Sequence, residues 1–386
     1  MSVLKNHAVL RWLVPVTAGV AVIGGGAAVG TFAATADPAL PPRTAAQLLE
    51  DLRTSRLDGL SGTVVQRADL GLPPIANLAG MAGGDELTSL ISGTHTLRVW
   101  YAGPDRQRLA LVDTLGERDV LRNGRDLWTW NSRANTASHR TLPADGELAA
   151  SAPATPADAA DRALAAIDPT TAVTVGRSGS VAGRSVYELV LTPRDKDSLV
   201  HQVRIALDAK EHVPLRFEVL ADGADEPAFE VAFTQVDFRT PDADQFRFNP
   251  PPGVTVTEEK ADRPGKHRPD ADLGKPGAGR GTDAPDVRTV GTGWTTVLVA
   301  KLDAAGGLDA AGGAARGGKP AGPAGGTEAA GADALAKVLG GLPQVSGDWG
   351  SGRLLTSKLF SVLLTDDGRV LVGLVTPERL YQVAKG

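Results

Sequence analysis

The chain has 386 residues, more than one ordinary hydrophobic core holds, so the length favours two domains with additional segments. With a formal net charge of −5, no strong nucleic-acid-binding surface is expected. With no cysteine, disulfides, thiolate metal sites, a cysteine nucleophile and a lipidated N-terminal cysteine are also excluded.

The N-terminal segment has the pattern of an export signal. Basic residues precede a largely apolar, uncharged run, and the small residues of Ala34–Ala36 follow it. This order is typical of a secretory signal peptide that is cleaved near Ala36. Residues 12–34 are also long enough, at roughly 20 residues, to anchor the chain in a bilayer if they are not cleaved. Residues 1–36 are thus predicted to be a signal peptide or a membrane anchor. In both cases the rest of the chain is exported, either secreted or held at the outer face of the cytoplasmic membrane.

A helix, a strand and an insertion are expected next. Residues 44–57 repeat apolar residues at helical spacing, and residues 59–70 read as a β-strand. Residues 71–92 do not alternate and mix apolar residues with Pro and Gly. We predict a helical or loop insertion that is either a fixed cover completing the core or a mobile lid. The residues predicted for such a lid are Leu70, Leu72, Ile75, Leu78, Leu87 and Leu90.

Strand after strand is expected from residue 94 onward. Apolar and polar residues alternate in these segments, which is typical of antiparallel strands with one apolar and one polar face. Asn123-Gly124 is a strong hairpin signal, a short helix is expected over residues 155–167, and the last strand is expected at residues 245–256. About ten or eleven strands with few helices predict a mainly β fold, a curved sheet or open barrel.

The C-terminal part differs in composition from the rest. Residues 258–288 are rich in Pro, Gly and charge and are predicted to be a disordered linker. A small α+β domain is expected over residues 289–386. Its expected elements are a strand around Trp294, a low-complexity loop over residues 304–331, a short helix over residues 333–339, two strands joined at residues 366–368 and a helix beginning near Pro377.

Two of the six tryptophans, Trp128 and Trp130, lie two residues apart in one predicted strand. Both side chains of this tryptophan pair therefore point to the same face of the sheet. Two interpretations remain open: the pair seals the core beneath the helices, or it lines an apolar cavity for a hydrophobic ligand. The other residues predicted to line such a cavity are Leu97, Val99, Tyr101, Leu109, Leu111, Val203, Ile205, Leu215 and Phe217.

The order of these segments resembles a known superfamily. The most telling stretches are the glycine and tryptophans of residues 124–131 and the closing FRFNPPPGV of residues 246–254. The chain resembles the LolA/LolB superfamily of lipoprotein carriers, and its two-domain layout is closest to the MucB/RseB regulators of envelope-stress sigma factors. This resemblance implies a LolA-like half-barrel over residues 43–257. The half-barrel would be a curved antiparallel sheet covered by a helical lid. The sheet would hold acyl chains on its concave side.

No catalytic pattern is readable in the sequence. The six histidines form no H-E-x-x-H motif and no close pair, and the carboxylates are scattered. We therefore expect no enzyme, no catalytic or metal-binding residues and no cofactor.

The resemblance implies an extracytoplasmic protein that binds the acyl chain of a lipid or lipoprotein. Its small domain would act at the membrane surface on a membrane protein such as an anti-sigma factor, and the whole would serve as an envelope sensor. Two alternatives remain open, a plain lipid or lipoprotein carrier and a ligand-free structural module of the envelope. No nucleic-acid partner is expected.

Overall fold

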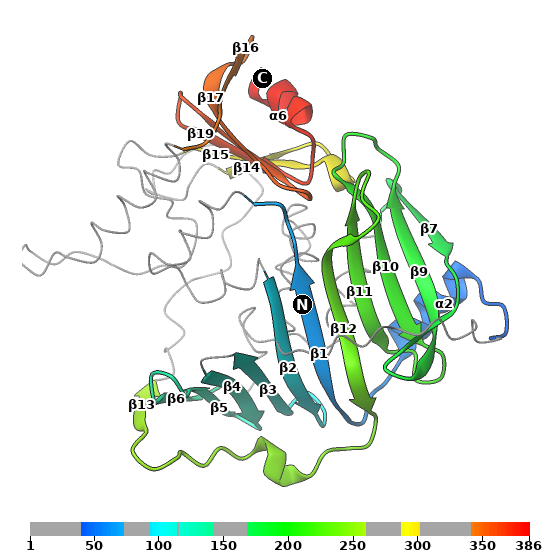
Figure 1. Cartoon of the computed structure of the whole chain (residues 1–386), viewed down its shortest axis with the longest axis vertical. Helices are drawn as coiled ribbons and strands as arrows, with labels where there is room; N and C mark the ends of the chain where they lie inside the picture. Colours follow the sequence, from blue (N-terminus) through cyan, green and yellow to red (C-terminus); the bar gives the residue numbers. More distant parts are fainter. Residues whose placement is uncertain (1–39, 73–92, 114–115, 143–167, 260–286, 302–340) are drawn as a thin grey trace, which may run out of the picture.

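The structure is a computed structural model (Figure 1). It describes residues 40–72, 93–113, 116–142, 168–259, 287–301 and 341–386. The predicted signal segment, most of the insertion after residue 72, the helix at residues 155–167 and the elements between residues 302 and 340 lie outside these ranges. No helix of the described residues is long and apolar enough to cross a membrane.

Most of the described strands form one large sheet (Figure 1). They are β1 Leu60–Ala68, β2 Gly93–Tyr101, β3 Arg106–Asp113, β4 Gly116–Asn123, β5 Asp126–Asn131, β6 Thr136–Thr141, β7 Thr171–Val175, β8 Gly179–Val181, β9 Arg184–Pro193, β10 Val200–Asp208, β11 Pro214–Ala221, β12 Pro227–Asp237 and β13 Thr255–Glu259. Their order is β13-β6-β5-β4-β3-β2-β1-β12-β11-β10-β9-β7, with β8 paired to β9. The mainly β prediction is confirmed, and the sheet is not closed into a barrel.

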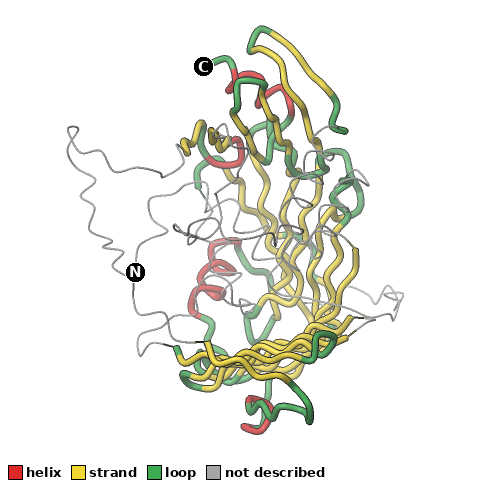
Figure 2. Tube along the Cα trace, turned by 90° about the vertical axis from the view of Figure 1, so that its left-hand side faces the viewer, coloured by secondary structure: helices red, strands yellow, loops and turns green. Residues whose placement is uncertain are grey.

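The large sheet bends, so that it has a concave and a convex side. Figure 2 shows an upright layer of strands turning into a flat layer at the bottom, with helix α2 (Ala45–Thr54) inside the bend. Thr44 begins this helix with a capping box: its hydroxyl accepts from the Gln47 amide at 3.2 Å, and the Gln47 side chain accepts from the Thr44 amide at 2.9 Å. Leu48 and Leu52 of the helix are buried against the sheet.

The segment that follows β12 departs from the predicted strand at residues 245–256. It begins with a short 3-10 helix, η2 (Ala243–Phe246), and becomes a strand only at β13. The prolines at residues 250–252 have no N–H to donate to a ladder, which explains why no strand forms there. β13 also pairs parallel to β6, whereas an antiparallel sheet was expected. Residues 243–259 are called the closing segment below.

A smaller sheet contains the remaining strands and is covered by helix α6 (Pro377–Ala384). Its strands are β14 Val287–Val290, β15 Val297–Lys301, β16 Gln344–Gly347, β17 Gly350–Thr356, β18 Ser361–Thr365 and β19 Arg369–Gly373. Their order is β14-β15-β19-β18-β17-β16. The hairpin at residues 366–368 and the helix from Pro377 were predicted, whereas β14 begins inside the predicted linker.

The strand predicted around Trp294 is instead a 3-10 helix, η3 (Gly293–Thr295), that precedes β15. Gly291 and Gly293 have positive φ angles of 92° and 57°, which a continuous strand cannot accommodate. Trp294 is thereby turned toward the large sheet, where its indole Nε1 donates to the Thr171 hydroxyl at 2.9 Å.

The two sheets share one buried hydrophobic cluster, while the smaller sheet also packs a cluster of its own against α6. The shared cluster contains Leu48 of α2 together with residues of the small domain, namely Trp294, Leu359 and Leu374. Backbone bonds cross between the parts as well: the Leu199 amide donates to the Leu374 carbonyl at 3.0 Å. The small domain is therefore packed into the large one and is not merely tethered to it.

Candidate functional site

Ladder register decides which predicted lining residues share a face of the sheet. Val99 lies opposite Leu109, Leu109 opposite Val120, and Val120 opposite Thr129. Directly paired residues point to the same side, so Thr129 shares the face of Val99. The tryptophan pair, which flanks Thr129 in β5, therefore points to the other face.

Helix α2 identifies the face of Val99 as concave. The ladders from β10 through β12 and β1 to β2 place Ile205 and Phe217 on the same face as Leu97. Ile205 is buried together with Leu48 of α2, which lies inside the bend. The nine predicted lining residues other than the tryptophan pair fall into two core clusters of the large domain. Val203, Ile205 and Phe217 belong to one, and Leu97, Val99, Tyr101, Leu109, Leu111 and Leu215 belong to the other.

Burial of the concave face changes from strand to strand. Leu97 and Val99 of β2 are 2% and 7% exposed, whereas Leu109 and Leu111 of β3 are only partly buried. Contacts of α2 with the sheet are concentrated on β7 and β9. Within the described residues, the apolar concave surface thus extends past the helix onto β2 and β3.

On the convex side, the tryptophan pair lies beneath the closing segment. Trp128 stacks on His139 with ring centroids 4.3 Å apart, and Phe248 lies 5.0 Å from Trp128 and 6.2 Å from Trp130. Nearby, η2 packs on β3 and β4 and buries Phe246. The single cavity predicted from all eleven residues is therefore corrected: alternate residues of a strand face opposite sides, and the tryptophan pair packs under the closing segment.

Residues 89–252 match the family model of the MucB/RseB N-terminal domain. The matched residues lie within the part of the chain that contains the large sheet. A similar solved structure is the MucA/MucB complex of Pseudomonas aeruginosa, 16% identical, covering 87% of this chain and 94% of that chain with a TM-score of 0.40. A LolA superfamily protein from Nitrosomonas europaea is 15% identical and covers 54% of this chain and 99% of that chain with a TM-score of 0.22. No curated protein matches the chain.

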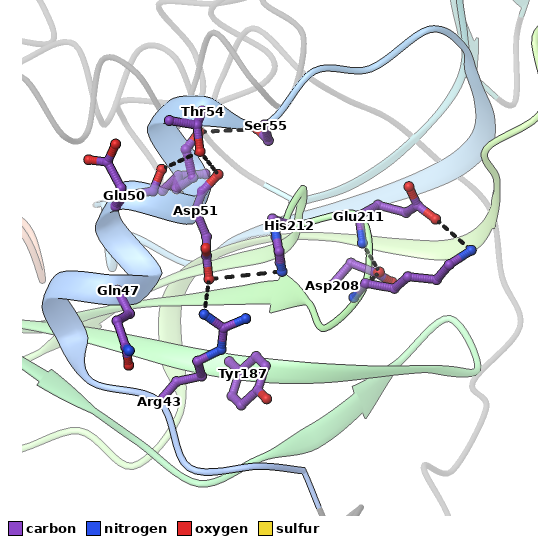
Figure 3. Close-up of polar contacts among 12 residues, drawn as sticks. Arg43, Gln47, Glu50, Asp51, Thr54, Ser55, Tyr187, Asp208, Glu211 and His212 are labelled. Carbon is purple, nitrogen blue, oxygen red and sulfur yellow. Dashed lines mark hydrogen bonds and ion pairs between the residues drawn. The ribbon is translucent and has the colours of Figure 1, made fainter.

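Polar contacts fix α2 on the concave side of the large sheet (Figure 3). Asp51 of the helix pairs with Arg43 at 3.2 Å and with His212 of the β10–β11 turn at 3.9 Å. Below them, the Tyr187 hydroxyl donates to the Pro41 carbonyl at 2.9 Å.

His201 pairs with Asp222 at 3.6 Å. Within the described ranges, no three His, Asp or Glu side chains could hold a metal ion.

The predicted lid residues can be placed only at the start of the insertion. Leu70 is buried and Leu72 packs against the cluster under α2, whereas Ile75, Leu78, Leu87 and Leu90 lie outside the described residues. Lys358 of the small domain contacts the chain where the insertion begins. Its amide donates to the Leu70 carbonyl at 2.7 Å, and its ammonium group lies 2.6 Å from the Asp69 carboxylate.

Under the closing segment, the large sheet also carries a charged pair of which one member is buried. Asp119, 1% exposed, accepts a hydrogen bond from Arg108 at 2.5 Å. Burial raises the pKa of Asp119 to about 6; Arg108 opposes this shift, and Glu117 adds to it. The folded protein therefore takes up a proton at Asp119 at a higher pH than the unfolded chain does.

Replacing Asp119 with asparagine is expected to remove this pH dependence. The pKa of Asp119 is higher in the folded protein than in the unfolded chain, where it is near 4. The contribution of Asp119 to the free energy of unfolding therefore increases as the pH falls from above 6 toward 4. Between pH 7.5 and pH 4.5 the free energy of unfolding of the wild type should rise by about 1–3 kcal/mol relative to Asp119→Asn. Urea denaturation at both pH values measures this difference, and parallel pH profiles for the two proteins would contradict the assignment.

Sequence reasoning missed His139 and Phe248 as partners of the tryptophan pair. Phe248 belongs to the FRFNPPPGV stretch that carries the family resemblance. The sequence did not indicate that this stretch packs on the tryptophan pair. His139 is paired with Trp128 in the β5–β6 ladder, and a correct hairpin register would have found it.

Proposed function

We propose that the protein binds an acyl chain of a lipid or lipoprotein on the concave face of its large sheet, as its resemblance to the MucB/RseB family implies. It would act outside the cytoplasm as an envelope sensor on a membrane partner, and the class of partner that its family implies is an anti-sigma factor. The observation that carries the proposal is the apolar concave surface that continues past α2 onto β2 and β3, with Leu109 and Leu111 only partly buried.

Burial of a hydrocarbon chain is sufficient chemistry for this role. Each buried methylene contributes about 0.8 kcal/mol, so an apolar surface binds an acyl chain without any catalytic or metal-binding group. Polar groups in such a site only need to orient the ligand. The proposal therefore requires no catalytic step.

The shared core supports a regulator rather than a plain carrier. The small domain contributes Trp294, Leu359 and Leu374 to the cluster that also contains Val203 and Ile205 of the concave face. A ligand that displaces side chains of this cluster would therefore act on the small domain directly. A carrier would need no such second domain inside its core.

Neighbouring residues of β3 provide a matched test of the concave face. Leu111 belongs to the concave cluster, whereas Val112 points to the opposite side and is 37% exposed. Leu111→Gln should weaken binding of a fluorescent fatty acid by about tenfold, because it removes apolar contact worth about 1–2 kcal/mol. Val112→Gln should leave the dissociation constant unchanged, and equal effects of both variants would contradict the proposed face.

Native mass spectrometry of the full chain purified from its own envelope tests the ligand class. A stoichiometric acyl lipid is the expected result. A ligand-free mass, together with no uptake when fatty acid or phospholipid is offered, would refute acyl binding and leave the structural-module alternative.

A further inference from the structure

The last strand before residues 260–286 is held weakly to the sheet. β13 pairs with β6 along one side, and all five of its residues are exposed. Since exposed backbone bonds contribute little net stability, side-chain contacts decide how firmly such an edge strand is attached. The chain continues from β13 toward the small domain, so its attachment sets where that connection begins.

One side chain of β6 contacts both β13 and β5. The Nδ1 atom of His139 lies 2.8 Å from a Glu258 carboxylate oxygen of β13, and its Nε2 atom lies 3.1 Å from an Asp126 carboxylate oxygen of β5. The ring stacks on Trp128 with an interplanar angle of 21°. The imidazole is thus fixed in one orientation between two carboxylates.

This geometry fits only one protonation state well. A neutral imidazole has one N–H donor and one acceptor nitrogen, whereas an ionised carboxylate only accepts. With carboxylates at both ring nitrogens, a neutral ring would leave one nitrogen lone pair facing a carboxylate oxygen. An imidazolium donates to both Glu258 and Asp126, and these charge-assisted hydrogen bonds are the stronger kind.

We propose that His139 is a pH-dependent latch that holds β13 on the sheet edge when it is protonated and loosens β13 when it is neutral. The latch lies outside the concave face and does not depend on acyl binding. It would make the attachment of the connection between the two domains respond to the acidity of the compartment.

The pKa of His139 supports this geometry. Burial acts to lower it, but hydrogen bonds to Glu258 and Asp126, together with their charges, outweigh burial and raise the pKa above its ordinary value. A raised pKa means that the folded, latched state binds the proton more tightly. Stabilisation by the latch is therefore complete below the ordinary value near 6.5 and is lost as pH rises through the raised pKa.

Among the described residues, two carboxylates pair with the ring. Asp126 belongs to β5 and Glu258 to β13. The part of the closing segment before β13 contributes the uncharged Phe248, whose ring centroid lies 5.0 Å from that of Trp128. The buried pair of Asp119 and Arg108 is on the same face but lies opposite Trp130 and Trp100 in the ladders, not opposite His139.

Hydrogen exchange of the full chain tests the latch. Protection of the amides of β13, corrected for the pH dependence of intrinsic exchange, should fall by about three- to tenfold between pH 5.5 and pH 8.0 in the wild type. In His139→Gln it should not change with pH. His201→Gln is the matched control, because His201 pairs only with the exposed Asp222 among the contacts seen and should keep the wild-type profile.

A second variant keeps the test valid if His139→Gln perturbs folding. Glu258 is 70% exposed, so Glu258→Gln should fold normally while losing one of the two charges that face the ring. NMR titration should then give a lower pKa for His139 in this variant than in the wild type. Wild-type protection that is constant across pH, pH dependence that persists in His139→Gln, or an unchanged His139 pKa in Glu258→Gln would each overturn the proposal.

Discussion

Replacing Trp294 with alanine is expected to lower the free energy of unfolding by about 3–5 kcal/mol, the usual cost of deleting a large buried aromatic side chain. Trp294 belongs to the small domain, yet it is 5% exposed within the core of the large one. Its removal leaves a cavity between the large and the small domain. It also removes the hydrogen bond that the Trp294 indole donates to the Thr171 hydroxyl at 2.9 Å. Urea denaturation followed by far-UV circular dichroism measures the loss.

Two variants separate the causes of this effect. Trp294→Phe keeps most of the ring and loses the hydrogen bond to Thr171, so it should cost only about 1–2 kcal/mol. Trp349 stacks on Tyr381 within the small domain, with centroids 5.4 Å apart, and is only partly buried. Trp349→Ala should therefore cost less than Trp294→Ala. If Trp294→Ala and Trp349→Ala were equally destabilising, the shared core would not be the source of the loss.

The shared core also affects how function can be tested. Truncation after Gly291 would remove Trp294, Leu359 and Leu374 from the cluster that supports the concave face. Loss of ligand binding in such a truncated chain would then report misfolding rather than a role of the small domain. Point variants in the full chain, such as the Leu111 and Val112 pair, avoid this ambiguity.

Local alternation in the sequence predicted the strands well but could not relate one strand's face to another's. Leu97 and Val99 were correctly placed together, as were Trp128 and Trp130, because the period of two holds within a strand. Whether the two sets share a face depends on the registers of three successive hairpins, from β2 to β5. A one-residue change in any of these registers moves every later side chain to the other side of the sheet.

Long-range packing explains the other differences. A strand was predicted over residues 245–256, yet Phe248 of this segment contacts Trp128, more than a hundred residues earlier in the chain. Trp294 likewise bonds to Thr171, 123 residues away. Neither contact can be recognised from the neighbouring sequence. Periodicity indicates which face of an element is apolar, but it does not indicate which distant segment packs on that face.

One buried side chain anchors the start of the closing segment. Phe246 is 1% exposed, and η2, which it ends, packs on β3 and β4. Phe246→Ala should therefore lower the free energy of unfolding by about 3–5 kcal/mol. Because the segment continues through Phe248 over the tryptophan pair, the same variant should expose Trp128 and Trp130 to water and shift the tryptophan fluorescence emission to longer wavelength.

The neighbouring residue supplies the control for this last prediction. Arg247 points into solvent and pairs with Asp244 at 2.7 Å, with the two side chains 65% and 80% exposed. Arg247→Ala should change the free energy of unfolding by no more than about 0.5 kcal/mol, because exposed ion pairs contribute little. A loss below about 1 kcal/mol in Phe246→Ala, with unchanged fluorescence, would mean that the closing segment lies on the convex face without stabilising it. The tryptophan pair would then need another explanation for its position on that side of the sheet.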